Sequence, residues 1–255
     1  MLFTQPPNEI RPAQRIVSVI PSITELLFHL GLNEQVIGIT PFCVHPQQWH
    51  TSKKRIGGPK KLHVEEIISL KPDLVIAGKE ENIKEQIEAI AEHAPVFLTD
   101  VVTIEDALGM INDISLLTGM HNRGCELIKQ IKTAMGSFKP DTTRKAVYVI
   151  WKAPYMCVGG DTFIHYMMEM AGFINVFAQQ FRYPVISIED MINSRTEIII
   201  LSSEPYPFKE IHAAELRSLL PQHIKIILAD GEMFSWYGSR MLEAVDYFKA
   251  LNNKS

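Results

Sequence analysis

The sequence predicts an α/β protein with two lobes of parallel strands joined by one long helix. Three observations lead to this fold class. Strand-like and helix-like segments alternate over residues 15–98 and again over residues 146–251. The strands lack polar alternation, which is typical of parallel βαβ units covered on both faces. No strand-like segment occurs from 103 to 137. We therefore expect lobes at residues 1–118 and 140–255, connected through residues 119–139.

The first alternating series opens with a strand at residues 15–20, followed by a helix from 22 to about 30. Ser22 and Glu25 have the spacing of a capping box, and Gly31 is typical of a helix C-terminus. The same reasoning gives strands at 36–39, 74–77 and 96–98, and helices at 64–70 and 83–91.

The connecting segment is helix-compatible over residues 121–137. At 1.5 Å per residue, a helix of 17 residues spans roughly 25 Å, enough to bridge two lobes. The second series then gives strands at 146–150, 198–201 and 224–228, and helices at 163–171, 188–193, 213–220 and 240–251.

Two segments of the chain resemble each other at a constant offset. Residues 65–77 read EEIISLKPDLVIA and residues 189–201 read EDMINSRTEIIIL, and 189 minus 65 is 124. Any amphipathic helix followed by a buried strand would look similar. The alternative is a duplicated unit that presents an acidic residue, Glu65 or Glu189, at the start of the same helix in each lobe.

Composition excludes several classes of protein. The chain of 255 residues is 46% hydrophobic and 21% charged, with a net charge of −4, which disfavours nucleic acid as a partner. Three cysteines do not make a disulfide framework. We find no membrane-spanning segment, and Met1 to Glu9 do not form a signal peptide. The chain as it stands is therefore expected in the cytoplasm, or in the periplasm if a leader was removed.

The motifs together resemble a known family. The opening RIVSVIPSITELL at 15–27, the core LKPDLVI at 70–76, Tyr183-Pro184 before Ser187, and Ser239-Arg240 before the last helix are similar to class III solute-binding proteins. These are the cobalamin, ferric-siderophore and haem receptors of ABC importers. The resemblance implies two Rossmann-like lobes, a ligand cleft between them, and no catalytic function.

The resemblance also implies a permease partner. In the cobalamin-binding members one glutamate on each lobe docks onto permease arginines, and those positions fall on Glu65 and Glu189. The alternative is that both are glutamates in the first turn of a helix, where the helix dipole favours them. We expect the protein to be a monomer that requires no cofactor of its own.

The expected ligand is a metal-containing chelate such as cobalamin, haem or a ferric siderophore. Two positions that are tryptophans in the cobalamin receptors align with Gly58 and Gly78 here. The resemblance therefore does not establish cobalamin as the ligand. Ligands bind beyond the carboxyl ends of the strands in such sheets. The side chains expected there are Phe42, His45, Lys79, Glu80, Trp151, Tyr155, Tyr183, Phe234, Trp236, Tyr237 and Arg240.

Several groups have more than one interpretation. His45 could ligate the metal of the chelate or simply form hydrogen bonds. Cys43 and Cys157 could join in a disulfide or share a metal, but two buried thiols are the simpler reading. Phe234 to Tyr237 suit a cleft loop better than a core. Gly159-Gly160-Asp161-Thr162 could receive an anion at a helix start, although a turn with Asp161 or Thr162 as N-cap is the simpler reading.

Two other functions stay open at this point. One is a cytosolic relative that stores, senses or processes a cofactor, using Cys43, His45, Lys79 and Glu80. The other is a receptor for free zinc or manganese, which needs three or more His, Asp or Glu ligands. None of the nine histidines has a recognisable spacing to another.

Overall fold

The computed structural model describes residues 1–7, 9–140 and 143–252. One residue of the first predicted lobe and five of the second therefore lie outside this description. The chain divides into two compact units. Unit 1 contains Met1–Val101, Glu105–Ile131 and Tyr237–Arg240. Unit 2 contains Val102–Ile104, Lys132–Trp236 and the chain from Met241 on. Within the described residues, no helix is both long enough and apolar enough to cross a membrane.

Unit 1 is built on a six-stranded sheet in which every pair is parallel. The order is β1 (Leu2–Phe3), β8 (Val96–Thr99), β7 (Leu74–Gly78), β2 (Ile16–Ser18), β3 (Val36–Ile39) and β4 (Lys54–Arg55). The four inner strands confirm the sequence prediction. The two-residue edge strands were missed, as was the small hairpin of β5 (Gly57–Gly58) and β6 (Lys61–Leu62).

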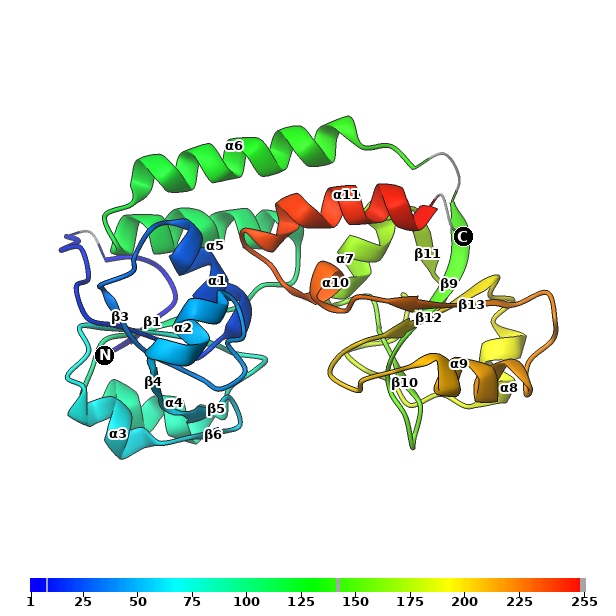
Figure 1. The fold of residues 1–255 in the computed structure, drawn as a ribbon, viewed down its shortest axis with the longest axis horizontal. Helices are drawn as coiled ribbons and strands as arrows, with labels where there is room; N and C mark the ends of the chain where they lie inside the picture. The colour runs from blue at the N-terminus through cyan, green and yellow to red at the C-terminus, as the bar shows by residue number, and fades with distance from the viewer. Residues whose placement is uncertain (8, 141–142, 253–255) are drawn as a thin grey trace. The chain divides into compact units, whose positions relative to one another are not determined.

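Helices cover both faces of this sheet (Figure 1). They are α1 (Pro21–His29), α2 (Gln47–Ser52), α3 (Val64–Ser69), α4 (Lys84–Ala91) and α5 (Ile104–Leu117). Helix α6 (His121–Ser137) begins in unit 1, where Gly124 lies against Ser115 of α5, and its residues from Lys132 on belong to unit 2. The 121–137 prediction for α6 is confirmed. The capping box predicted at Ser22 is wrong. Helix α1 starts one residue earlier, with Pro21 in its first turn and Ile20 as a cap without a side-chain bond.

Unit 2 is built around β9 (Arg144–Trp151), which has strands on both sides. On one side lie β12 (Ile198–Ser202) and then β13 (Lys225–Ala229), all parallel. On the other side, β11 (Phe173–Asn175) pairs parallel with the start of β9, and β10 (Met156–Cys157) pairs antiparallel with its end. The helices are α7 (Phe163–Met170), α8 (Ile188–Asn193), α9 (Glu210–Arg217), α10 (Glu232–Ser235) and α11 (Arg240–Asn252).

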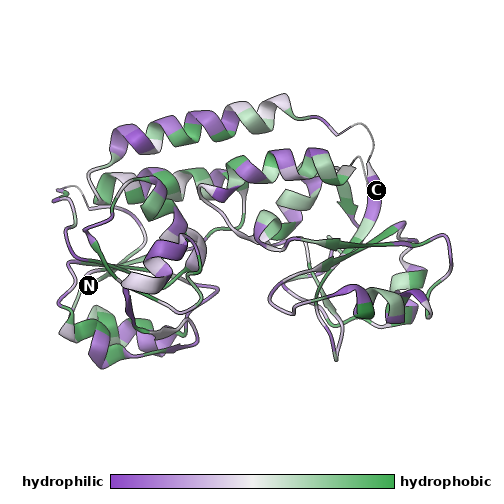
Figure 2. Cartoon of the chain, viewed as in Figure 1, coloured by the Kyte–Doolittle hydropathy of each residue, from purple (hydrophilic) through white to green (hydrophobic). Residues whose placement is uncertain are grey.

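Hydrophobic strands form the core of each unit. Every residue of β2, β7 and β12 is buried. Figure 2 shows the same strands as mainly hydrophobic, whereas α3, α4 and α6 alternate between hydrophobic and hydrophilic residues. Burial of this continuous apolar surface is the main term that stabilises each unit.

The internal repeat is present in the structure. Helix α3 starts at Val64 and α8 at Ile188, and β7 and β12 start at Leu74 and Ile198, so both elements keep the offset of 124. Lys71 and Arg195, also 124 apart, both have a left-handed backbone, with φ of 47° and 56°. The acidic residues Asp73 and Glu197, again 124 apart, also make the same kind of contact. Asp73 accepts from the backbone N–H of Arg15 at 2.8 Å, and Glu197 from that of Lys145 at 2.7 Å.

Candidate functional site

The candidate ligand-binding residues lie beyond the carboxyl ends of the strands in each unit, where α/β sheets bind ligands. In unit 1, the loop after β3 carries Phe42, Cys43 and His45, and the loop after β7 carries Lys79 and Glu80. In unit 2, the ends of β9 and β10 carry Trp151, Tyr155 and Met156.

Phe42 is the exposed aromatic of unit 1, with 61% of its surface accessible. Its ring packs over Gly58, where an added Cβ would lie 3.1 Å from Phe42 Cε2. At Gly78 an added Cβ would lie 2.7 Å from Ile20 Cδ1. A tryptophan therefore fits at neither glycine without moving its neighbour, and Phe42 supplies the aromatic surface there.

The loop after β7 is held in one conformation by Asn82. Its Oδ1 accepts from the backbone N–H of Gly78 at 2.8 Å, and its Nδ2 donates to the Pro59 carbonyl at 3.1 Å. Lys79 and Glu80 are both exposed on this fixed loop. Lys79 Nζ forms an ion pair with Asp100 Oδ2 at 2.6 Å, which neutralises part of its charge.

The buried thiols are structural. Cys43 Sγ accepts a hydrogen bond from Thr24 Oγ1 at 3.0 Å and lies 3.2 Å from Thr40 Oγ1. Burial raises the pKa of the Cys43 thiol and raises that of Cys157 to about 12, so both stay protonated near neutral pH. Both cysteines are free. The interpretation as two buried thiols is confirmed, and the axial-ligand role of His45, which is half-buried, stays a prediction.

Unit 2 presents an apolar surface that the sequence analysis largely missed. Met156 lies directly opposite Trp151 in β9 and opposite Val185 in an isolated bridge. Because directly opposed residues project from the same face of antiparallel strands, the three side chains form a row. Trp151 is 41% exposed, Val185 61% and the nearby Phe181 80%. We call Trp151, Met156, Phe181 and Val185 the ribbon surface.

The glycine motif before α7 holds this surface in place. Gly159 N–H donates to the Arg182 carbonyl at 2.8 Å, and Gly160 N–H donates to the Gln180 carbonyl at 2.9 Å. A Cβ added to Gly159 would lie 2.4 Å from the Gln180 carbonyl oxygen, and one added to Gly160 would lie 2.1 Å from the Ala178 carbonyl oxygen. Because both amides are used internally, neither glycine N–H is available to an anion.

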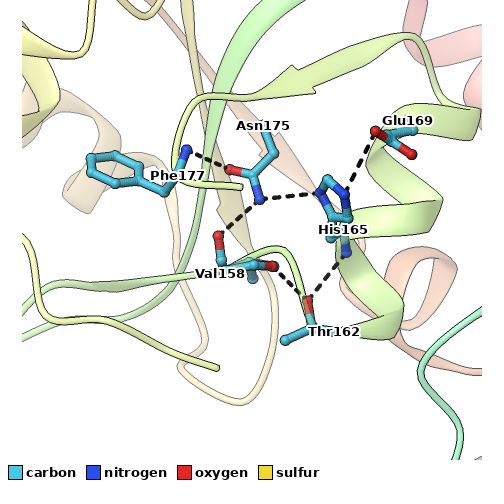
Figure 3. Close-up of polar contacts among 7 residues, drawn as sticks. Val158, Thr162, His165, Glu169, Asn175 and Phe177 are labelled. Atoms are coloured by element: carbon cyan, nitrogen blue, oxygen red, sulfur yellow. Dashed lines mark hydrogen bonds and ion pairs between the residues drawn. The ribbon is translucent and has the colours of Figure 1, made fainter. Parts of the chain in front are cut away.

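A polar network joins the same motif to α7 and β11. Thr162 caps α7 by accepting from the His165 backbone N–H at 3.3 Å, as the turn interpretation predicts. Asn175 Nδ2 donates to the Val158 carbonyl at 2.9 Å, and its Oδ1 accepts from the Phe177 N–H at 3.0 Å (Figure 3). The second proton on Asn175 Nδ2 points to His165 Nδ1, 3.4 Å away. Because Nδ1 then accepts, the imidazole proton lies on Nε2, which is 3.6 Å from Glu169 Oε1.

Tyr155 and Tyr183 are both half-buried beside the ribbon surface. Tyr155 packs partly against the core of unit 2, and burial raises the pKa of its hydroxyl. The Arg182 guanidinium lies over the Tyr183 ring, 5.7 Å from its centroid. Their ligand contacts stay predictions.

Phe234 and Trp236 do not form a cleft loop. Phe234 is fully buried in α10, with its ring 5.0 Å from that of Tyr148 and 4.8 Å from that of Phe248. It is a core residue, because α10 turns it inward. Trp236 is 7% exposed, and its indole N–H donates to Glu204 Oε1 at 3.0 Å. Both were expected on a loop surface, and the structure corrects this.

Arg240 is also not displayed as a ligand group. Its side chain is 8% exposed and forms a two-pronged ion pair with Glu25, with Nε to Oε2 at 3.0 Å. The charge expected to meet a carboxylate or phosphate is therefore satisfied within unit 1. Tyr237 lies in the same segment and donates to Glu81 Oε1 at 3.5 Å. Burial raises the pKa of this hydroxyl well above its usual value.

Glu65 and Glu189 occupy the same position in α3 and α8, and both are exposed. The acidic residue after each one is held within its own helix turn. Glu66 accepts from His63 Nδ1 at 2.9 Å and pairs with Lys54 at 3.3 Å. Asp190 accepts from the N–H and Oγ of Ser187 at 2.8 and 2.7 Å. These hydrogen bonds lower the pKa of the Glu66 and Asp190 carboxyls.

Metal ligands do not gather in the part of the chain that the structure describes. No group of three or more His, Cys, Asp or Glu in residues 1–7, 9–140 and 143–252 is arranged to hold an ion. A free-metal site of the kind that needs three protein ligands is therefore not seen among these residues.

Comparison with known proteins places the chain among binding proteins. A vitamin B12-binding protein of Vibrio parahaemolyticus is 26% identical over 197 residues, covering 75% of this chain and 71% of the relative. A periplasmic haem-binding protein from Pseudomonas aeruginosa superposes with a TM-score of 0.79 at 18% identity, covering 95% of this chain and 94% of the other. An ABC-type Fe³⁺-hydroxamate transport protein from Saccharomonospora viridis gives 0.72 at 18% identity, covering 96% and 94%.

The two structural likenesses establish the fold, since their sequence identity is low. The family model described as periplasmic binding protein matches residues 16–225. That match covers most of both predicted lobes and includes the segments that resemble class III solute-binding proteins, except Arg15 and the Ser239-Arg240 pair. The chain is a substrate-binding protein rather than an enzyme, and it belongs to the periplasmic binding protein family.

Proposed function

We propose that this protein binds a metal-containing cofactor or chelate, of the cobalamin, haem or ferric-siderophore type, and delivers it to an ABC permease. The relatives are named for vitamin B12, haem and Fe³⁺-hydroxamate, which are all bulky metal chelates. The observation that carries the proposal is the display of large apolar side chains beyond the strand ends of each unit. Exposed apolar patches of this kind mark binding sites.

In unit 1 the proposed contact is Phe42, with Lys79, Glu80 and His45 on the neighbouring loops. In unit 2 it is the ribbon surface, flanked by Tyr155 and Tyr183. Phe42 and Phe181 are 61% and 80% exposed. A solvated aromatic ring gains the most from a flat conjugated ligand, because stacking removes it from water.

Titration with three purified probes tests this function: cyanocobalamin, hemin and a ferric hydroxamate siderophore. Binding of one of them with a matching rise in melting temperature supports the proposal, since a ligand stabilises the folded state that binds it. No binding and no thermal shift with any of the three would rule the proposal out.

We also propose that Glu65 and Glu189 dock the protein onto basic residues of the permease. The support is the repeat itself. In each unit the second acid of the pair is taken up within the chain, by His63 and Lys54 or by Ser187. The first acid stays exposed at the helix start. Two carboxylates on rigid elements suit recognition by arginine side chains.

Ligand uptake in the host separates docking from binding. Glu65→Gln and Glu189→Gln should slow uptake while leaving the affinity of the purified protein for its ligand unchanged. Glu85→Gln, in the first turn of α4, is the matched control. Normal uptake by the double variant would contradict the docking role.

A further inference from the structure

We infer that Lys61 and Phe42 together recognise an acidic group carried by a flat ligand, so that the ligand is an anionic chelate. This inference rests on the proposed function and narrows its substrate class. Lys61 was not among the residues singled out from the sequence. Its place beside Phe42 follows from the register of a two-stranded hairpin.

The hairpin pairs Gly58 with Lys61 and Gly57 with Leu62. Directly opposed residues of antiparallel strands project from the same face, with Cβ atoms about 5 Å apart. Leu62 is buried, with 6% of its surface accessible, so its face of the hairpin points inward. Gly58 and Lys61 share the outward face, and Lys61 is exposed there.

The Phe42 ring occupies that same outward face. Its Cε2 lies 3.1 Å from the point where a Cβ on Gly58 would be. Phe42, Gly58 and Lys61 therefore form a row on one face of the hairpin, with the aromatic ring over Gly58 and the Lys61 side chain starting beside it. A flat ligand that stacks on Phe42 brings its edge toward Lys61.

The hairpin is rigid before any ligand arrives. Leu62 N–H donates to Gln86 Oε1 at 3.0 Å, and His63 N–H donates to the Ile56 carbonyl at 2.9 Å. At the turn, Lys60 Nζ donates to the Glu80 carbonyl at 2.9 Å. Binding at a surface ordered in advance loses less conformational entropy.

The charge of this region points to an anion. Residues 43–64 contain five Lys and Arg and no Asp or Glu, within a chain whose net charge is −4. The other four cations have partners inside unit 1: Lys53 with the Asn33 carbonyl, Lys54 with Glu66, Arg55 with His50 and Lys60 with the Glu80 carbonyl. Lys61 is the exposed cation on the face that carries Phe42.

The candidate ligands differ in the acidic groups that they carry at their edges. A haem carries two ionised propionates at the edge of a flat ring, whereas the periphery of cobalamin is mainly neutral amides. The row of Phe42 and Lys61 suits a ring with carboxylates on its edge. The one anionic group of cobalamin is the phosphodiester of its nucleotide loop, so its ring edge would offer Lys61 amides rather than carboxylates.

Hemin and its dimethyl ester test this directly, because they share ring and iron and differ only in the two acids. Affinities are measured by absorbance titration in the same detergent buffer at low and high salt. Lys61→Gln should weaken hemin binding about fivefold, and Lys61→Glu about tenfold, with little effect on the ester. The preference for hemin over the ester should shrink as salt rises.

Lys84→Gln is the matched control, an exposed lysine on α4 of the same unit with 79% of its side chain accessible. Equal loss for hemin and its ester, or no loss with either Lys61 variant, would overturn the inference. So would binding of cyanocobalamin in preference to hemin, which would leave the proposed function standing. If no chelate binds to the unaltered protein, the proposed function fails as well.

Discussion

Phe181 allows the proposed role of the ribbon surface to be tested with little risk to folding. Its ring is 80% exposed, so removing it takes almost nothing from the core of unit 2. Substitutions at such sites usually change stability by less than about 0.5 kcal/mol. We therefore expect Phe181→Ala to fold with nearly unaltered stability and to bind the chelate less well.

The size of the loss follows from the exposed surface. An aromatic side chain offers about 200 Å², and 80% of that is on the order of 160 Å². A ligand that covers half of this area removes about 80 Å² from water, worth about 2 kcal/mol at about 25 cal/mol per Å². That corresponds to a dissociation constant about thirtyfold larger.

Isothermal titration calorimetry with the probe that binds the unaltered protein measures this change. Ile211→Ala on α9 is the control, because Ile211 is 70% exposed in the same unit but lies outside the ribbon surface. A change of less than twofold for Phe181→Ala, or equal losses for both variants, would refute the assignment of the ribbon surface to the ligand.

Three further outcomes follow from buried groups. Phe234→Ala should lower the free energy of unfolding by about 3–5 kcal/mol in urea denaturation, as expected for a core aromatic, and a loss below about 1 kcal/mol would contradict its burial. Arg240→Gln should lower the free energy of unfolding by about 3–5 kcal/mol, because the Glu25 carboxylate stays buried without the arginine. The double variant Arg240→Gln with Glu25→Gln should recover part of this loss, and equal losses for the single and double variants would argue against the ion pair. Burial raises the pKa of Glu204 above 4.5, so stability measured against pH should fall as pH rises from 4.5 through the raised pKa. Glu204→Gln should abolish that fall, and an unchanged profile would show that another group causes it.

Much of the fold could be predicted because the signals are local. The apolar strands and the helix over 121–137 follow from the periodicity of neighbouring residues. The edge strands β1 and β4 could not be predicted in this way. Each is two residues long and exists only because a longer strand lies beside it.

The site was less predictable because its geometry depends on distant contacts. Glu25 and Arg240 are 215 residues apart, so nothing near Arg240 in the sequence shows that its charge is already used. Phe234 is turned inward by a four-residue helix that no periodicity reveals. Met156 and Val185 become neighbours through strand pairing across a loop, and only their alternation with buried Cys157 and Ile186 hints at it.

Tyr237–Arg240 belong to unit 1, although the chain on both sides of them belongs to unit 2. During synthesis, the partner of Glu25 therefore leaves the ribosome only after almost all of the polypeptide has been made. Until then the N-terminal half lacks Arg240, the arginine that pairs with this carboxylate. A fragment ending near residue 139 would keep that defect permanently, so the two halves should mature together rather than one after the other.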